Sequence, residues 1–88
     1  MNNNQMSQLT SLLVEAAHHY RLAQEAYGAR KLKQCLTIIE QLNGHPSFDQ
    51  IMQVMPEMIT AQENHDWLGL ADILEFELTA FIGSNSQH

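Results

Sequence analysis

The chain has 88 residues, enough for one small domain with an apolar core but too few for two. Its composition, 44% apolar and 16% charged, is typical of a globular protein and argues against a disordered chain. The formal net charge is −6, and no Lys or Arg accompanies the eight acids of residues 34–88, which disfavours nucleic-acid binding because that binding needs cations against phosphates.

The first predicted helix covers residues 6–27. Apolar residues recur there at intervals of three and four, as on one face of an amphipathic helix. The members of this stripe are Met6, Leu9, Leu13, Ala16, Tyr20, Ala23 and Tyr27. Ser7 or an earlier Asn is expected near the start of the helix, and residues 1–5 are expected to be disordered.

A second helix is predicted over residues 29–43, because a new apolar stripe begins there out of phase with the first. Its members are Leu32, Cys35, Leu36, Ile39 and Leu42. Gly28 lies at the break, where a glycine in the left-handed conformation could end the first helix. One long bent helix over residues 6–43 is the alternative. The run Asn43-Gly44-His45-Pro46 combines turn residues with a proline and ends the second helix.

The third predicted helix covers residues 48–63. Ser47 and Gln50 have the spacing of a capping box, with Ser47 as the N-cap. Pro56 removes one backbone donor inside the helix and predicts a kink near residues 52–55. The apolar stripe of this helix comprises Phe48, Ile51, Met52, Met55, Met58, Ile59 and Gln62.

The last predicted helix covers residues 67–82, with Asp66 as its N-cap. Its main stripe comprises Trp67, Leu70, Ala71, Leu74, Leu78, Phe81 and Ile82. A second, thinner apolar strip lies roughly opposite and comprises Gly69, Ile73, Phe76 and Ala80. A helix with two apolar faces is usually buried on two sides, by its own chain or by a partner. Residues 83–88 are expected to form a disordered tail.

These elements predict an all-α fold, a small antiparallel bundle of four helices in one domain over residues 6–82. Cys35 is the only cysteine, so no disulfide can form within the chain, which fits a reducing compartment. No apolar run is long enough to span a membrane, and the first five residues lack the pattern of a secretory signal. We therefore expect a cytoplasmic protein with no membrane contact.

Several residues carry potential chemistry, but each has a simpler structural explanation. Glu15 and His18 match the Glu-x-x-His spacing of carboxylate-bridged metal sites, yet they project away from the buried stripe. The methionines at 52, 55 and 58 fit an adaptable apolar surface better than thioether ligands. Cys35 is expected to be a buried, inert thiol, although Lys31 lies one turn away and could lower its pKa.

Three carboxylates of the last helix are also candidates for a site. Asp72 and Glu75 share the solvent side of the helix. Glu77 falls near the edge of the buried stripe, where it would need a partner such as Tyr20, Tyr27 or Arg30. No catalytic constellation and no phosphate-binding loop accompany these acids, so we expect no enzyme activity, no cofactor and no metal.

Residues 66–78, which read Asp-Trp-Leu-Gly-Leu-Ala-Asp-Ile-Leu-Glu-Phe-Glu-Leu, resemble the C-terminal helix of a group of small bacterial all-helical proteins. In that group a stretch of the form L-A-D-x-L-E-(aromatic)-E-L follows an acidic turn. The resemblance covers these 13 residues, and the rest of the chain only through its helix pattern. It implies a helical fold and no particular activity.

The leading functional hypothesis is a non-enzymatic protein-interaction module, such as an adaptor, a chaperone-like protein or a regulatory subunit. Self-association as a homodimer is expected through Gly69, Ile73, Phe76 and Ala80; the competing explanation is that another helix of the same chain covers this strip. The alternative function is a metal-binding bundle whose ligands, Glu15, His18 and Glu77, are shared across a dimer.

Overall fold

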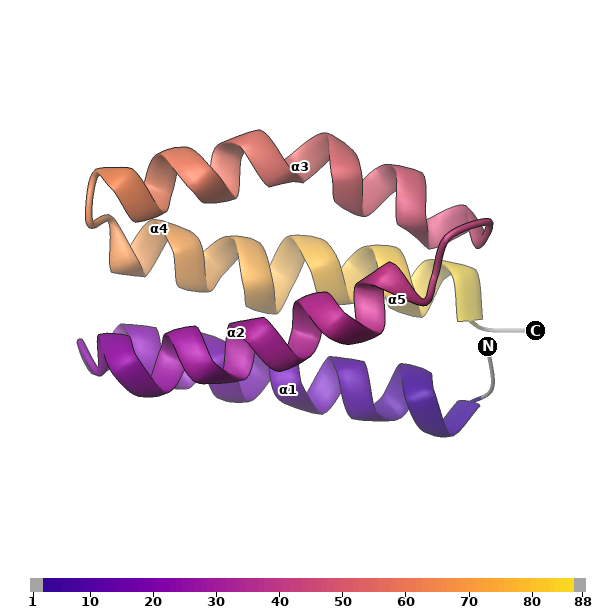
Figure 1. Ribbon diagram of the computed structural model, residues 1–88, viewed down its shortest axis with the longest axis horizontal. Coiled ribbons are helices and arrows are strands. Elements are labelled where there is room, and N and C mark those ends of the chain that lie inside the picture. Colours follow the sequence, from indigo (N-terminus) through magenta and orange to yellow (C-terminus); the bar gives the residue numbers. More distant parts are fainter. Residues whose placement is uncertain (1–2, 87–88) are drawn as a thin grey trace.

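The computed structural model describes residues 3–86 and contains four helices in this range, with no strand. Three of them are α1 (Asn3–Arg21), α2 (Glu25–Glu40) and α3 (Pro46–Glu63). The last helix is continuous but has three parts, α4 (Trp67–Asp72), the π-helical segment η1 (Ile73–Leu78) and α5 (Thr79–Ser86). Successive helices run in opposite directions (Figure 1), which confirms the predicted all-α antiparallel bundle of four helices.

The last helix lies between α3 on one side and the α1–α2 pair on the other (Figure 1). Close backbone contacts join α1 to α2, α1 to the last helix, and α3 to the last helix, whereas α2 and α3 make few. The last helix therefore packs against neighbours on both sides, whereas α2 and α3 pack only loosely against each other. None of the described helices is both long enough and apolar enough to cross a membrane.

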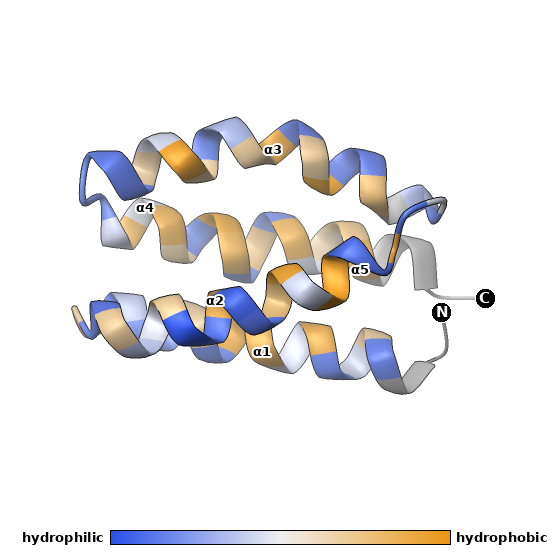
Figure 2. Ribbon diagram, in the orientation of Figure 1, coloured by the Kyte–Doolittle hydropathy of each residue, from blue (hydrophilic) through white to orange (hydrophobic). Residues whose placement is uncertain are grey.

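The helix stripes meet in one core, and apolar and polar residues alternate along each ribbon as a single-stripe pattern requires (Figure 2). Most predicted core positions are buried, and the side chains of Ile38, Val54 and Ala61 are buried in addition. Tyr27 was wrongly placed in the first stripe, because its side chain is 55% exposed. Ala23 is likewise exposed, since the first helix ends before either residue.

The first helix ends at Arg21, not at Tyr27, and the predicted boundary at Gly28 is wrong. Ala23 has a left-handed φ of 60°, and two backbone bonds close the turn, from Ala23 N–H to the Tyr20 carbonyl (3.0 Å) and from Gln24 N–H to the His19 carbonyl (2.8 Å). This pattern is a Schellman motif, in which glycine usually takes the left-handed position. Here an alanine takes it, so the glycine rule pointed to the wrong residue.

Gly28 instead lies inside α2, where it allows α2 to approach α1. A Cβ atom on Gly28 would lie 2.9 Å from two ring carbons of Tyr20. The Tyr20 ring also stacks on Trp67, with ring centroids 5.4 Å apart and planes 16° from parallel. This stacking restrains the ring, so it has little freedom to move away from an added side chain at position 28. Gly28 thus serves packing, not helix termination.

The remaining boundaries are closer to the predictions, although α2 covers Glu25–Glu40 and not residues 29–43. Gly44, with a φ of 96°, lies in the predicted turn between α2 and α3. Pro46 is the first residue of α3, a position that needs no amide donor, so Ser47 lies in the first turn and is not the N-cap. α3 continues through Pro56 and follows an arched path (Figure 1). The Asp66 carboxylate caps the last helix as predicted, accepting a hydrogen bond from Gly69 N–H at 3.0 Å.

The first and last helices extend further toward the chain ends than predicted, although α1, which ends early at Arg21, is shorter overall. α1 includes residues 3–5, and the last helix continues past residue 82 to Ser86. The predictions of disorder for residues 1–2 and 87–88 lie outside the described residues.

Gly28→Ala tests the close contact between α1 and α2. Alanine favours a helix by about 1 kcal/mol over glycine, but the added methyl collides with the Tyr20 ring, and overpacking costs about 1–3 kcal/mol. We expect a lower free energy of unfolding, measured by urea denaturation. In a Tyr20→Leu background the same substitution should become neutral or stabilising. Equal effects in both backgrounds would contradict the proposed collision.

Candidate functional site

The strip predicted to mediate self-association does not form one exposed surface. Gly69 and Ile73 line a groove of about 450 Å³ between α3 and the last helix, and the side chain of Ile73 is buried. Phe76 is 59% exposed and lies beneath the Arg21 guanidinium of α1, with Cζ 5.6 Å from the ring centroid. Ala80 is also exposed. α3 thus flanks the first half of the strip, Gly69 and Ile73, whereas Phe76 lies beside α1.

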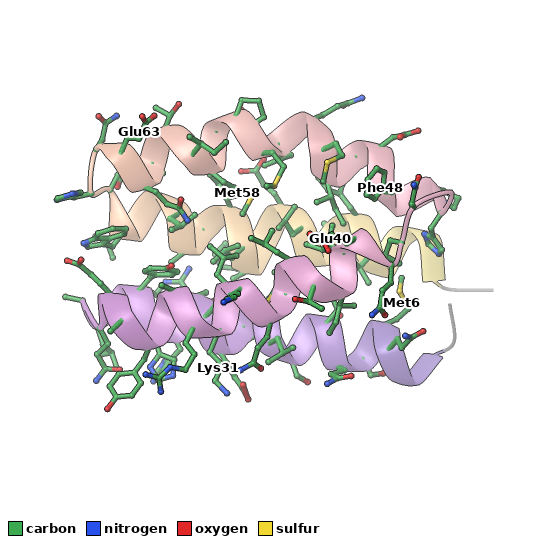
Figure 3. All side chains as sticks on the ribbon, in the orientation of Figure 1. Met6, Lys31, Glu40, Phe48, Met58 and Glu63 are labelled. Atoms are coloured by element: carbon green, nitrogen blue, oxygen red, sulfur yellow. The ribbon has the colours of Figure 1, made fainter. Side chains whose placement is uncertain are left out.

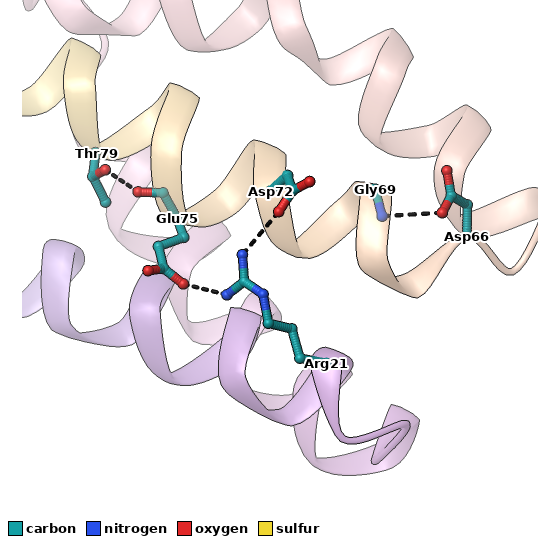
Figure 4. A network of polar contacts seen from close by, with 6 residues as sticks. All are labelled: Arg21, Asp66, Gly69, Asp72, Glu75 and Thr79. Atoms are coloured by element: carbon teal, nitrogen blue, oxygen red, sulfur yellow. Dashed lines mark hydrogen bonds and ion pairs between the residues drawn. The ribbon is translucent and has the colours of Figure 1, made fainter.

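The π-helical segment explains why the strip divides. The predicted strip assumes an ideal α-helix, but Ile73–Leu78 form a π-helical segment, whose turns contain more residues than α turns. Residues after Ile73 are therefore rotated relative to those before it. The Thr79 hydroxyl donates a hydrogen bond to the Glu75 carbonyl inside this segment (Figure 4). The register shift places Ile73 against α3 and Phe76 beside α1.

Gly69 also has a different role from the one predicted. A Cβ atom at position 69 would lie 2.3 Å from a carboxylate oxygen of Asp66, the N-cap of the same helix. The glycine therefore makes room for the cap, in addition to lining the groove with α3. Glu77 lines this groove too, together with Glu57 and Asp66. Glu77 is exposed, so it does not need the buried partner, such as Tyr20, Tyr27 or Arg30, that burial would have required.

Arg21, the final residue of α1, joins that helix to the π-helical region through two carboxylates (Figure 4). One guanidinium nitrogen lies 2.9 Å from an Asp72 carboxylate oxygen, and the other donates to Glu75. These hydrogen bonds, first that to Asp72 and then that to Glu75, raise the pKa of Arg21 above its usual value. We call Arg21, Asp72 and Glu75 the Arg21 clamp. Both acids lie on the predicted solvent side of their helix, but no local pattern connects them to their shared cation, 51 and 54 residues away.

An aromatic stack lies at the same end of the bundle. The Trp67 ring is flanked by Tyr20 and His65, with centroids 5.4 Å away in each pair and planes 16° and 12° from parallel. Trp67 Nε1 donates a hydrogen bond to Glu25 at 3.1 Å, which links the last helix to α2. Burial, followed by the charges of Cys35 and Glu25, raises the pKa of Tyr20. These contacts pack the end of α1 against the starts of α2 and of the last helix, which is a sufficient structural role for the stack.

An apolar groove lies between α2 and α3, and we call it the α2–α3 groove. Its volume is about 430 Å³. Its apolar lining comprises Leu36, Ile39, Phe48, Met52 and Met55, and its polar lining residues are Glu40 and Asn43. Figure 3 shows Phe48 and Glu40 in the space between these helices. The groove follows from the topology, since α2 packs on α1 while α3 packs on the last helix.

The structure does not bring together the residues considered for chemistry. Glu15 forms an ion pair with Lys31 at 3.2 Å, His18 is exposed, and Glu77 lies in the groove with α3. Within residues 3–86 no group of three or more His, Cys, Asp or Glu side chains is arranged to hold a metal ion.

The Cys35 thiol is fully buried, as predicted. Desolvation raises its pKa to about 12, more than offsetting the lowering by Lys31. Because the thiolate is the nucleophilic form, a thiol in this environment is unsuited to nucleophilic chemistry near neutral pH.

Comparison with protein families assigns the chain to one of them. The family model described as "Domain of unknown function (DUF8042)" matches residues 2–84. The chain therefore belongs to the DUF8042 family, and the match extends over all four helices. A search of curated proteins and a search of solved structures each found no match.

Arg21→Met tests whether the Arg21 clamp stabilises the bundle. Methionine keeps an apolar stem but removes the cation, leaving Asp72 and Glu75 as neighbouring negative charges. Because the Arg21 and Glu75 side chains are about one-third exposed, at 30% and 32%, we expect the free energy of unfolding to fall by only about 1 kcal/mol. Urea denaturation at low and high salt measures the loss, which should shrink as salt rises. Lys33→Met, at an exposed position, is the matched control, and equal losses in both variants would contradict the role of the clamp.

Proposed function

We propose that this member of the DUF8042 family is a non-enzymatic protein-interaction module whose docking surface is the α2–α3 groove. The single observation that supports this function is an apolar groove between two helices that make few close backbone contacts with each other. Grooves of this kind accept an amphipathic helix from a partner, which fills them with its own apolar face.

The side chains of the groove favour docking over a purely structural role. Met52 is 37% exposed although it belongs to the apolar stripe of α3, and Met55 lies beside it, half-buried. Methionine side chains are unbranched and flexible, so they adapt to partners of different shapes. Ile59, one turn beyond Met55, is 50% exposed and extends the apolar row along α3. Water contact with these three side chains would end when a partner helix binds, which provides the driving force.

Photo-crosslinking in the native cells tests this function. A benzophenone side chain at position 52 is expected to capture a second protein, because this position lines the α2–α3 groove. The same side chain at Glu57, on the opposite flank of α3, is the matched control. Adducts at position 52 and none at position 57, measured by immunoblotting and mass spectrometry, are the expected result. No adduct at position 52, or equal capture at both, would contradict the groove as a docking surface.

We further propose that the chain self-associates through the exposed ring of Phe76, which lies away from the α2–α3 groove. Phe76→Glu should convert a dimer of the 10.0 kDa chain into a monomer, measured by size-exclusion chromatography with light scattering. The substitution should preserve folding, because the new carboxylate would lie beside the Arg21 guanidinium. Leu68→Glu, at another exposed apolar position, is the control. A monomeric wild-type protein would overturn this proposal.

A further inference from the structure

We infer that the partner of the α2–α3 groove is an amphipathic helix whose apolar stripe spans about three turns and whose flanks carry Lys or Arg. This inference rests on the proposed docking function and specifies the chemistry of the occupant. It combines the length of the exposed apolar row with the charges along its rim.

The length follows from α3. Phe48, Met52, Met55 and Ile59 are spaced by three or four residues, so they form one row along the helix. From Phe48 to Ile59 this row is ~16 Å long at the rise of an α-helix, which corresponds to about three turns of a partner. On the facing side Leu36 and Ile39 of α2 complete the apolar lining. A partner helix therefore needs an apolar residue on each of three successive turns.

The charges of the rim select a basic partner. Glu40 lines the groove, and on α3 Asp49 lies three residues before Met52 while Glu63 lies four residues after Ile59. Residues three and four apart share a helix face, so both acids flank the exposed row. All three carboxylate residues are exposed, and Lys33 on α2 is the cation nearest to this rim in sequence position. Glu40, the one charged residue in the groove's lining, and the flanking Asp49 and Glu63 make this rim negative, with Glu40 and Asp49 at the end of α2 and the start of α3.

A second copy of the chain fits this groove poorly. Two copies joined groove to groove would place Glu40, Asp49 and Glu63 of each molecule near those of the other, and residues 34–88 contain no Lys or Arg to compensate. Two of the chain's four cations are also engaged within the molecule, Arg21 with Asp72 and Glu75, and Lys31 with Glu15. Like charges placed opposite each other disfavour association. The occupant must therefore bring its own positive charge.

Three labelled model peptides of equal length test the inference by fluorescence polarisation with the full chain. The first has Leu at helical spacing and Lys elsewhere, the second replaces every Lys by Glu, and the third has the composition of the first in an order without a stripe. We expect the first to bind at least about tenfold more tightly than the others, with affinity falling as salt rises. Glu40→Lys should weaken its binding, whereas Glu57→Lys, the same change on the other flank of α3, should not.

The variant Met52→Gln/Ile59→Gln distinguishes failure of the docking function from failure of the basic partner. Both side chains are exposed, so the fold should tolerate the change, which circular dichroism checks. If the acidic peptide binds as tightly as the basic one and this variant weakens both, the groove is a docking site but the basic partner is wrong. If neither striped peptide binds, or the variant changes nothing, the docking function fails as well. If the variant lowers the mass of the peptide-free protein in light scattering, a second copy occupies the groove and the inference is overturned.

Discussion

Burial of the last helix between two different neighbours is the constraint on which the rest of this fold depends. One side of that helix packs on α1 and the other on α3. Leu70, Leu74 and Leu78 are fully buried between them. The π turn at Ile73–Leu78 rotates the second half of the helix relative to the first, so Ile73 contacts the side of α3 while Phe76 and Glu75 lie beside α1.

This arrangement leaves α2 and α3 with few close contacts to each other. Each packs on a different member of the central pair, α2 on α1 and α3 on the last helix. The apolar residues on their facing sides are therefore less completely covered than the core, and they line the α2–α3 groove. In a bundle of this size an apolar groove forgoes burial that closer packing would supply, and this is the observation behind the proposed docking function.

Some charged side chains of this protein form ion pairs between helices, and others lie around the α2–α3 groove. Arg21 and Lys31 hold helices together through Asp72, Glu75 and Glu15. Glu40, Asp49 and Glu63, the acids around the α2–α3 groove, take part in none of these three ion pairs. At the other end of the bundle, the left-handed residues Ala23 and His65 end α1 and α3 in the same type of turn. Both turns hold the stack of Tyr20, Trp67 and His65 in place.

Local patterns in the sequence determined the helical class, the number of helices, most core positions, the turn at Gly44 and the cap at Asp66. These features depend on residues within a few positions of each other, where periodicity and turn chemistry are informative. The buried thiol of Cys35 also followed from its place in a stripe. The Met-rich face of α3 was visible as well, although its partner helix across the groove was not.

Tertiary structure alone decided the end of the first helix, the division of the second strip, the Arg21 clamp and the α2–α3 groove. Gly28 reads locally as a helix terminator, but the Tyr20 ring requires it inside α2. The strip of Gly69, Ile73, Phe76 and Ala80 assumed one constant helical period, which the π turn breaks. Arg21 meets its acids across more than 50 residues of sequence. The sequence by itself therefore specified each helix and its buried stripe, whereas the contacts between helices set the register and the open surface, because those contacts join residues that no local pattern connects.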